Sequence, residues 1–484
     1  MAEKQEEKQE FRRSLGLLDG TMLVSSGMIG SGIFIVSAEM ARTVGGSGWL
    51  ILLWVLTGVI TVFAAISYGE LAGMMPKAGG QFVYLQRAFG NLTAFLYGWT
   101  VFSVIQTGTI AAVAMAFAKY TGFFIPWLSA DNVLLDAGFL KINAPQFFAI
   151  VSIIFQTYVN SRGVQNGKII LLVFTMAKLI ALFALILLGL FFAKKSYLAE
   201  NFANPWASSM FTKAADGTWN TQAIGGFALM MAMGTAIIGS LFSSDAWNNV
   251  TFIAGEIRNP RRNIPLSLFL GTIIVTVLYV AANMAYLNLL PLHGDPSVAA
   301  TDVVGRGIMF ADNDRVGTSA AFQIFGNGAA AIMAALIMVS TFGCNSGLIL
   351  SGARVYYAMS KEGLFFKKAS ELNRFAVPGF ALWVQCAWAC LLCLSGSYND
   401  LLTYATFASL IFYCVTLAGI FALRKKEPDA ERPYKVPFYP ITPIIYILIT
   451  VGICLILLST QTASTVKGLL LVGLGVPIYY FIKK

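Results

Sequence analysis

The sequence predicts an all-α integral membrane protein in which twelve transmembrane helices form one bundle. Of its 484 residues, 57% are hydrophobic and only 12% are charged, and the mean hydropathy is +0.72. A soluble protein carries about a quarter charged residues. The apolar residues form runs of about 20 or more, long enough to cross a bilayer core of about 30 Å. The spans are expected at 15–38, 48–74, 91–118, 145–160, 164–193, 223–254, 264–290, 319–358, 376–395, 399–423, 437–458 and 463–482.

The distribution of basic residues predicts the orientation of these spans. Most of the 33 Lys and Arg residues lie in the N-terminal arm (1–14), in the loops that share its side, and at the C-terminus. The positive-inside rule places both termini in the cytoplasm. The net charge of +10 is therefore interpreted as topology signals and contacts to anionic lipid, not as a nucleic-acid surface. No cleavable signal peptide precedes the first span, so we expect a multi-pass protein of the cell (inner) membrane.

The first span contains a polar interruption, Gly30-Ser31-Gly32, in the middle of its apolar run. Glycine weakens a helix through backbone entropy, and serine competes for its hydrogen bonds. Backbone opened at membrane depth is tolerated only where protein or a water-filled cavity satisfies it. The pattern predicts a broken first helix.

A second interruption, at 239–246, lies in the sixth span. The chain then divides into five spans (15–193) and five more (223–423) that enter the membrane from opposite sides, because five is odd. Two broken helices in corresponding positions of an inverted repeat indicate a binding site near the membrane midplane. Helices 11 and 12, within 437–484, fall outside this 5+5 repeat.

The two breaks suggest a site for an amino acid zwitterion. Freed N–H groups at a helix N-terminus suit a carboxylate, and freed carbonyls suit an ammonium group. We expect the α-carboxylate at the N–H groups of Gly30, Ser31 and Gly32, and the α-ammonium at the carbonyls of Ser26, Gly27, Phe242, Ser243 and Asp245. The alternative is a pair of kinks that serve only helix packing.

Two side chains at the second break have open roles. The ring of Phe242 either closes over the substrate as a gate or packs in the core. Asp245 is an intramembrane carboxylate, which is expensive unless it has a partner. It either contacts the substrate ammonium or caps the restarting half-helix at 246–248, and the cap is the favoured interpretation.

Of all single residues, Lys178 gives the most specific indication of function. It lies in an apolar run with no acid nearby, and at about 1.5 Å per residue it is roughly 20 Å from either end of its span, too far to snorkel. Its ammonium is expected to face the bundle interior and to bind carbonyls freed at the first break. A fixed charge there could replace a bound sodium ion.

The sequence lacks the arrangements of common catalytic sites. Its single histidine, His293, lies in a loop, and there is no phosphate-binding G-x-x-x-x-G-K-[ST] motif. The cysteines lie inside spans, and those at 386, 390 and 393 are interpreted as packing residues, not metal ligands. We expect no enzyme, no cofactor and no metal.

Several runs resemble those of the amino acid–polyamine–organocation superfamily, and within it the L-type amino acid transporter family. They are Ile29–Phe34, Tyr68-Gly69-Glu70-Leu71, Pro76–Leu85, Ala88-Phe89-Gly90, Ala177-Lys178-Leu179, Phe242–Asn248 and Gly255–Pro260.

The resemblance implies sodium- and proton-independent exchange of L-amino acids, most readily neutral ones, with Lys178 standing in for sodium and Phe242 as the gate. Animal members carry a cysteine between helices 3 and 4 that bridges to a glycoprotein subunit. The corresponding loop here, 119–144, has none, so no disulfide-linked heavy subunit is expected. The alternatives are proton-coupled transport of a cationic amino acid or polyamine, with Asp245 meeting the extra charge, and a receptor that senses amino acids without moving them.

Overall fold

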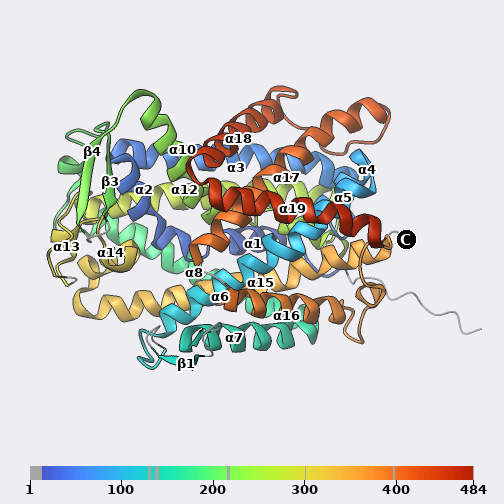
Figure 1. Cartoon of the computed structure of the whole chain (residues 1–484), viewed down its shortest axis with the longest axis horizontal. Coiled ribbons are helices and arrows are strands. Elements are labelled where there is room, and N and C mark those ends of the chain that lie inside the picture. The colour runs from blue at the N-terminus through green and yellow to red at the C-terminus, as the bar shows by residue number, and fades with distance from the viewer. Residues whose placement is uncertain are drawn as a thin grey trace, which may run out of the picture.

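The protein is a bundle of helices that run roughly along its longest axis (Figure 1). The computed structural model describes residues 13–128, 132–136, 141–214, 218–299, 301–395 and 398–482. Residues 1–12 of the predicted N-terminal arm lie outside these ranges. One end of the bundle carries β3, β4, α13 and α14 and is called the hairpin end; the other carries α4 and the C-terminal end of α19 and is called the terminus end.

Helices occupy every segment in which the sequence predicts a span. They are α1 (Leu17–Met28) with α2 (Val36–Val44), α3 (Ser47–Met74), α5 (Asn91–Thr100) with α6 (Gln106–Thr121), α7 (Ala144–Ser161), α8 (Val164–Phe191), α10 (Gly226–Ser243) with α11 (Asn249–Phe252), α12 (Pro260–Leu289), α15 (Ala329–Lys361), α16 (Gly379–Ser395), α17 (Tyr398–Lys426), α18 (Ile441–Thr460) and α19 (Thr462–Ile482). Shorter helices are α4 (Gln81–Phe89), α9 (Leu198–Asn201), α13 (Val303–Arg306) and α14 (Val316–Phe325).

Nine helices within the described ranges are long and apolar enough to cross a membrane. The three predicted spans outside this set differ in continuity, length or apolar content. The first is divided between α1 and α2, and α16 has only 17 residues. Helix α7 has 18 residues, as many as α10, but it contains polar residues such as Gln146, Gln156 and Asn160. The chain is a multi-pass helical membrane protein with at least these nine candidate spans.

The structure corrects the expected position of several helix ends. The eighth span is not one helix over 319–358: α14 ends at Phe325, the next residue Gly326 has a φ of +67°, and α15 starts at Ala329. Glycine adopts this left-handed backbone without steric cost. The second break also lies later than predicted, because α10 continues through Gly239 to Ser243 and the chain opens at 244–248. The broken first helix extends to Val44, beyond the expected 38.

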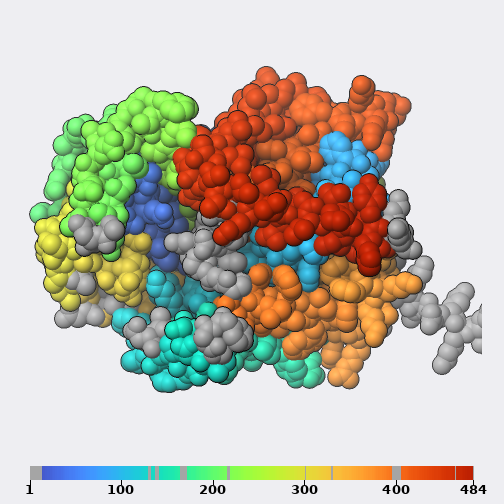
Figure 2. All heavy atoms as spheres, in the orientation of Figure 1, coloured from blue at the N-terminus to red at the C-terminus, as the bar shows by residue number. Residues whose placement is uncertain are grey.

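Two small antiparallel hairpins qualify the all-α expectation. Strand β1 (Val133–Asp136) pairs with β2 (Lys141–Asn143), and β3 (Ser209–Lys213) pairs with β4 (Trp219–Ala223). Both hairpins lie in connections between long helices. The C-terminal helices α18 and α19, red in the space-filling view, lie across the outer surface of the bundle (Figure 2).

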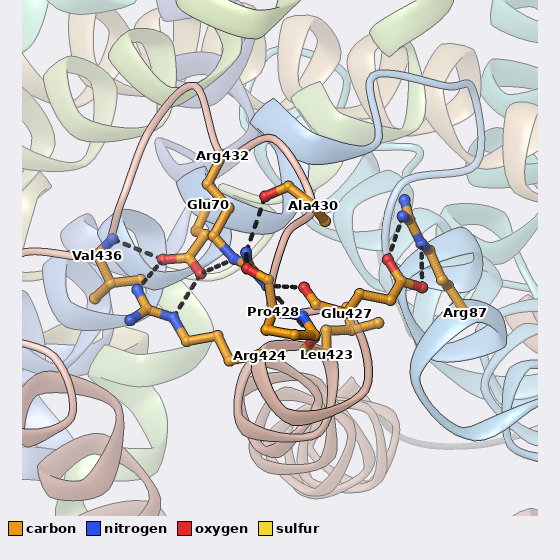
Figure 3. A network of polar contacts seen from close by, with 9 residues as sticks. All are labelled: Glu70, Arg87, Leu423, Arg424, Glu427, Pro428, Ala430, Arg432 and Val436. Atoms are coloured by element: carbon orange, nitrogen blue, oxygen red, sulfur yellow. Dashed lines mark hydrogen bonds and ion pairs between the residues drawn. The ribbon is translucent and has the colours of Figure 1, made fainter.

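A polar network fastens α3, α4 and α17 together at the terminus end (Figure 3). The Glu70 side chain, 1% exposed, accepts hydrogen bonds from Arg424 Nε at 2.9 Å, Arg424 Nη2 at 2.6 Å and the Val436 N–H at 2.8 Å. Arg432 Nε is 3.5 Å from the same carboxylate. Glu427 pairs with Arg87 of α4. We call these five charged side chains the terminus-end network.

Candidate functional site

The two helix breaks touch each other inside the bundle. A Cβ atom added to Gly32 would overlap with Ser243 Oγ, and one added to Gly27 would lie 3.0 Å from the Ala246 carbonyl oxygen. Only glycine, without a side chain, allows such an approach of two backbones. The segment 26–32 and the segment 243–246 therefore meet, and we call this region the crossing site.

The second break depends on an unusual backbone conformation. Ala246 has a φ of +63°, in the left-handed region that residues other than glycine rarely adopt. Such a conformation costs about 1–3 kcal/mol and persists where the surrounding structure imposes it, often at functional sites. It lies in the stretch where the chain turns between α10 and α11.

Tyr279 of α12 joins the two breaks. Its hydroxyl lies 2.8 Å from the Met28 carbonyl oxygen and 2.9 Å from the Ser243 carbonyl oxygen, the last residues of α1 and α10. A single hydroxyl donates one proton, so it serves these two acceptors alternately. Nothing in the sequence distinguishes Tyr279, because a single tyrosine in an apolar helix is common.

The Lys178 ammonium lies at the first break. Its Nζ donates to the Ser26 carbonyl at 2.8 Å and to the Ile29 carbonyl at 2.7 Å, and the side chain is 1% exposed. On the same helix Ile180 and Phe183 are 62% and 53% exposed. Helix α8 thus turns apolar side chains outward and its lysine inward, which confirms the predicted contact with carbonyls freed at the first break.

Helix α15 also contacts the first break. Ser340 Oγ donates to the Ile29 carbonyl at 3.1 Å, and Cys344 Sγ lies 3.3 Å from the Gly27 carbonyl oxygen. Together with Lys178, these side chains occupy carbonyls at the break, including those of Ser26 and Gly27 that were expected to receive the α-ammonium. These contacts link helices far apart in sequence, so no local pattern indicates them.

The N–H groups at the first break have fewer partners than its carbonyls. The Gly30 N–H donates to the Met28 carbonyl at 3.0 Å. In the described part of the chain, the N–H groups of Ser31 and Gly32 have no backbone carbonyl as partner. Ser31 is the N-cap of the short 3-10 turn Gly32–Phe34 and Gly32 is its first residue, a position where unpaired N–H groups favour an anion.

Asp245 differs from its favoured interpretation as a helix cap. Helix α11 has Asn248 at its N-cap and no side-chain cap hydrogen bond. The Asp245 carboxylate instead accepts a hydrogen bond from the Tyr413 hydroxyl of α17 at 2.5 Å. The cap was predicted from nearby sequence, whereas the partner lies 168 residues away. Phe242, one turn earlier, is half-buried, and its carbonyl accepts from the Asp245 N–H at 3.1 Å.

A small cavity of about 20 Å³ lies beside the second break. We call it the first cavity. Asp245 and Ala246 contribute to its wall, so a ligand held at the crossing site would reach into it. Apolar residues such as Val101, Ile105, Phe252 and Leu348 form part of the wall. It also contains side chains with amide or hydroxyl groups from α4, α5, α6, α11, α17 and the second break: Gln81, Tyr97, Gln106, Thr109, Asn248, Asn249, Ser409 and Tyr413. Asn249 Nδ2 is buried and has no hydrogen-bond partner within the described structure.

A buried ion pair joins α15 to the segment that follows α11. Arg354 Nε donates to Glu256 Oε1 at 2.8 Å, and the two side chains are 0% and 1% exposed. Beside it, the Leu15 N–H donates to the Glu256 carbonyl at 3.0 Å and the Arg258 N–H donates to the Leu15 carbonyl at 2.8 Å. The start of α1 is thereby attached to the segment that follows α11.

Comparison with known proteins gives a consistent family assignment. The sequence model of a family described as "Amino acid permease" matches residues 15–479. The serine/threonine exchanger SteT of Bacillus subtilis (strain 168) is 28% identical over 484 residues, covering 99% of this chain and 98% of that protein. The b(0,+)-type amino acid transporter 1 of Mus musculus is 27% identical over 98% of this chain and 88% of its own length. The large neutral amino acids transporter small subunit 2 of Mus musculus is 26% identical, with 97% and 81% covered.

Proposed function

Since the chain belongs to the amino acid permease family, and is an amino acid transporter and not an enzyme, we propose that it exchanges L-amino acids, most readily neutral ones, without sodium. The observation that carries this proposal is the crossing site: N–H groups of Ser31 and Gly32 without backbone partners, next to an ammonium held by two carbonyls. One relative, SteT of Bacillus subtilis, is a serine/threonine exchanger, which agrees with the proposal.

The proposed architecture is twelve transmembrane helices in a 5+5 inverted repeat, with both termini in the cytoplasm. In it, α1 with α2 and α10 with α11 are the broken helices 1 and 6, and α18 and α19 are helices 11 and 12 outside the repeat. The repeat explains why the two breaks meet in the centre of the bundle. The protein then works in the cell membrane without a disulfide-linked heavy subunit, since the loop at 119–144 contains no cysteine.

In the proposed mechanism, the α-carboxylate binds at the N–H groups of Ser31 and Gly32, with Gly30 beside them. The α-ammonium binds near the second break, beside Asp245 and the carbonyls of Phe242 and Ser243. These two carbonyls already accept from the Asp245 N–H and the Tyr279 hydroxyl, so the ammonium uses their second lone pairs. The Ser26 and Gly27 carbonyls already accept bonds from Lys178 and Cys344, so they shape the site. Because Lys178 supplies a positive charge at the first break, no sodium ion is needed there.

Exchange requires the two ends of the bundle to open alternately. In this structure the terminus end is fastened by the Arg354–Glu256 pair and by the attachment of Leu15. Opening that end separates the start of α1 from residues 256–258. Phe242 acts as the gate on the other side of the bound amino acid, where its half-buried ring lies one turn before Asp245.

The test is counterflow in proteoliposomes, with a labelled neutral amino acid outside and each of twenty unlabelled amino acids inside. The proposal expects uptake that depends on the internal amino acid and is unchanged by sodium or by a proton gradient. Accumulation without any internal amino acid would contradict exchange. The absence of uptake for all twenty would instead favour the receptor alternative.

A specific observation keeps the cationic substrate as a second candidate. The carboxylate of Asp245 lies in the wall of the first cavity, where it could meet the extra charge of a cationic amino acid or polyamine, with proton coupling. Asp245→Asn removes that charge and keeps the shape. If the substrate is cationic, arginine exchange should fall much more than alanine exchange. An equal change for both substrates would contradict this candidate.

A further inference from the structure

The connection between α6 and α7 exposes many large apolar side chains. In its described part (122–128, 132–136 and 141–143), seven of them are 44–52% exposed: Phe123, Phe124, Ile125, Trp127, Val133, Leu134 and Leu135. Asn132 Nδ2 donates to the Trp127 carbonyl at 2.6 Å, which ties the two halves of this set together. A large exposed apolar patch marks a surface that contacts protein or membrane. We call these seven side chains the apolar loop patch.

Strand β1 carries three consecutive members of the patch, Val133, Leu134 and Leu135. All four residues of β1 are exposed, and its pairing with β2 shifts by one residue between Val133 and Leu135. Three consecutive side chains of a strand do not all point to one side. A partner protein resting on one side of β1 would leave apolar side chains of the other side in water, whereas lipid surrounds a hairpin. The patch therefore favours lipid as its neighbour.

The β3–β4 hairpin shows the opposite pattern. The rings of Phe211 and Trp219 pack against Phe310, with centroids 5.9 and 5.0 Å apart. The exposed residues of β4 are mostly polar, namely Asn220, Thr221, Gln222 and Ala223. A hairpin with one side on the protein and one side in water has this distribution. In the proposed architecture two membrane spans separate the two connections, so both lie on the same side of the membrane, and only the β1–β2 hairpin has an apolar surface.

The apolar loop patch continues into the lipid-facing side of α7. Figure 1 shows β1 beside α7 at the edge of the bundle. Asn143, the last residue of β2, caps α7 by accepting from the Gln146 N–H at 3.0 Å, so the hairpin leads directly into the helix. The exposed apolar residues of α7 recur every three or four positions and form one side of the helix: Phe147, Val151, Ile154, Phe155 and Tyr158. This side begins in the first turn, so lipid reaches the level of the hairpin.

The polar groups of the hairpin limit how deep it lies. A two-stranded sheet has two open edges, and open edges do not occur in the hydrocarbon core of a bilayer. Lys141 Nζ and Asp136 Oδ2 form an ion pair at 2.9 Å, and these side chains are 66% and 48% exposed. Tryptophan is enriched where headgroups meet acyl chains, and Trp127 is 52% exposed. The headgroup region suits both the polar edges and the apolar side chains.

We propose that the connection between α6 and α7 is an interfacial anchor. It inserts the apolar loop patch about 5–10 Å into the boundary between headgroups and acyl chains of the leaflet that it faces. Phospholipid is thus its binding partner, and the anchor attaches the adjoining ends of α6 and α7 to the bilayer. This role is independent of the amino acid that the protein exchanges.

The test is quenching of tryptophan fluorescence in the full-length protein, reconstituted in phosphatidylcholine liposomes. The quenchers are bromine atoms on the acyl chains, either near the headgroup or near the terminal methyl, and iodide in the water. The signal of Trp127 is the difference between the wild type and Trp127→Phe. Bromines near the headgroup are expected to quench this signal about twofold more than deep bromines, and iodide to quench it little. Trp54→Phe is the control, because Trp54 is 1% exposed and its signal should respond little to any of the quenchers.

A charged variant shows whether the apolar side chains hold the anchor in place. Leu134→Asp combined with Leu135→Asp should lower quenching of the Trp127 signal by lipid bromines to about half or less and raise quenching by iodide, since carboxylates favour water over the interface. Thr221→Asp on the exposed strand β4 is the matched control and should change neither. Strong quenching by iodide alone in the wild type would overturn the proposal. So would protection from all quenchers, which indicates a protein cover, or an unchanged signal in the double variant.

Discussion

The crossing site and the terminus-end network both bury charge, but they stabilise it in opposite ways. At the crossing site, Lys178 is held by two backbone carbonyls, and no carboxylate in the described structure lies within 4 Å of it. In the terminus-end network, the Glu70 carboxylate receives two guanidinium groups and one backbone N–H. The first arrangement needs a broken helix, and the second needs only well-placed side chains.

Because of this difference, we assign substrate binding to the crossing site and stabilisation of the fold to the terminus-end network. Carbonyl dipoles solvate the Lys178 ammonium but leave its full positive charge, so the crossing site still attracts a carboxylate. The terminus-end network satisfies its own charges, and Arg432 also donates to the carbonyls of Glu427, Pro428 and Ala430 beyond α17. We therefore expect changes at the crossing site to alter transport first, and changes in the network to alter stability first.

The largest expected effect on stability is that of Glu70→Ala. It leaves Arg424 and Arg432 without their shared carboxylate, and breaking a buried pair costs about 3–5 kcal/mol. Thermal unfolding of the detergent-solubilised protein should occur at a clearly lower temperature, while the substrate KM of the folded fraction stays near the wild-type value. A raised KM with unchanged unfolding temperature would reverse the assignment. Arg261→Ala is a suitable control, because its partner Glu431 is 71% exposed.

Lys178→Ala should give the largest effect on transport. Without the ammonium, the Ser26 and Ile29 carbonyls lose a charge-assisted donor, and the site loses the charge that attracts the carboxylate. Exchange should fall by about 100-fold, which corresponds to about 2.7 kcal/mol. The measurement is the initial rate of exchange per folded protein in liposomes, with insertion checked separately. Unchanged rates would contradict the role assigned to this lysine.

An intermediate effect is expected from Gly32→Ala compared with Gly30→Ala. A Cβ atom on residue 32 overlaps with Ser243, whereas on residue 30 its nearest neighbour is Cys344 Sγ at 3.9 Å, an ordinary contact. Overpacking costs about 1–3 kcal/mol. Gly32→Ala should therefore weaken exchange by at least tenfold more than Gly30→Ala, measured in the same liposome assay. Equal effects would mean that the two breaks do not depend on their close approach.

The smallest effect concerns the pH dependence of the network. Hydrogen bonds from Arg87 lower the pKa of the Glu427 carboxyl below its ordinary value. A lowered pKa means that the pair stabilises the folded protein above the unfolded pKa of about 4.3 and loses this contribution as the pH falls through the folded pKa. The pair is partly exposed, so the contribution is about 0.5 kcal/mol or less. Unfolding temperatures of Glu427→Gln and the wild type should differ slightly at pH 7 and converge near pH 3.

The sequence by itself determined where the helices lie and that the first and sixth spans are broken. Apolar runs long enough to cross a bilayer place the helices, and the glycine and serine residues of 30–32 predict the first break, because both depend on local chemistry alone. The lysine that the lipid cannot solvate is also visible in sequence, since no other charge accompanies it. The proposed roles of Gly30, Ser31, Gly32 and Phe242 in transport stay predictions.

Only the tertiary structure decided the partners of these residues. Lys178 binds a carbonyl 152 residues away, and Asp245 accepts from a tyrosine 168 residues away instead of capping its own half-helix. The displaced second break belongs here too, because the left-handed conformation of Ala246 persists only where the surrounding structure imposes it. So does the division of the eighth span at Gly326, which the apolar run did not indicate. Local propensity fixes where a helix can form, whereas the hydrogen-bond partners of a buried charge depend on which helices become neighbours.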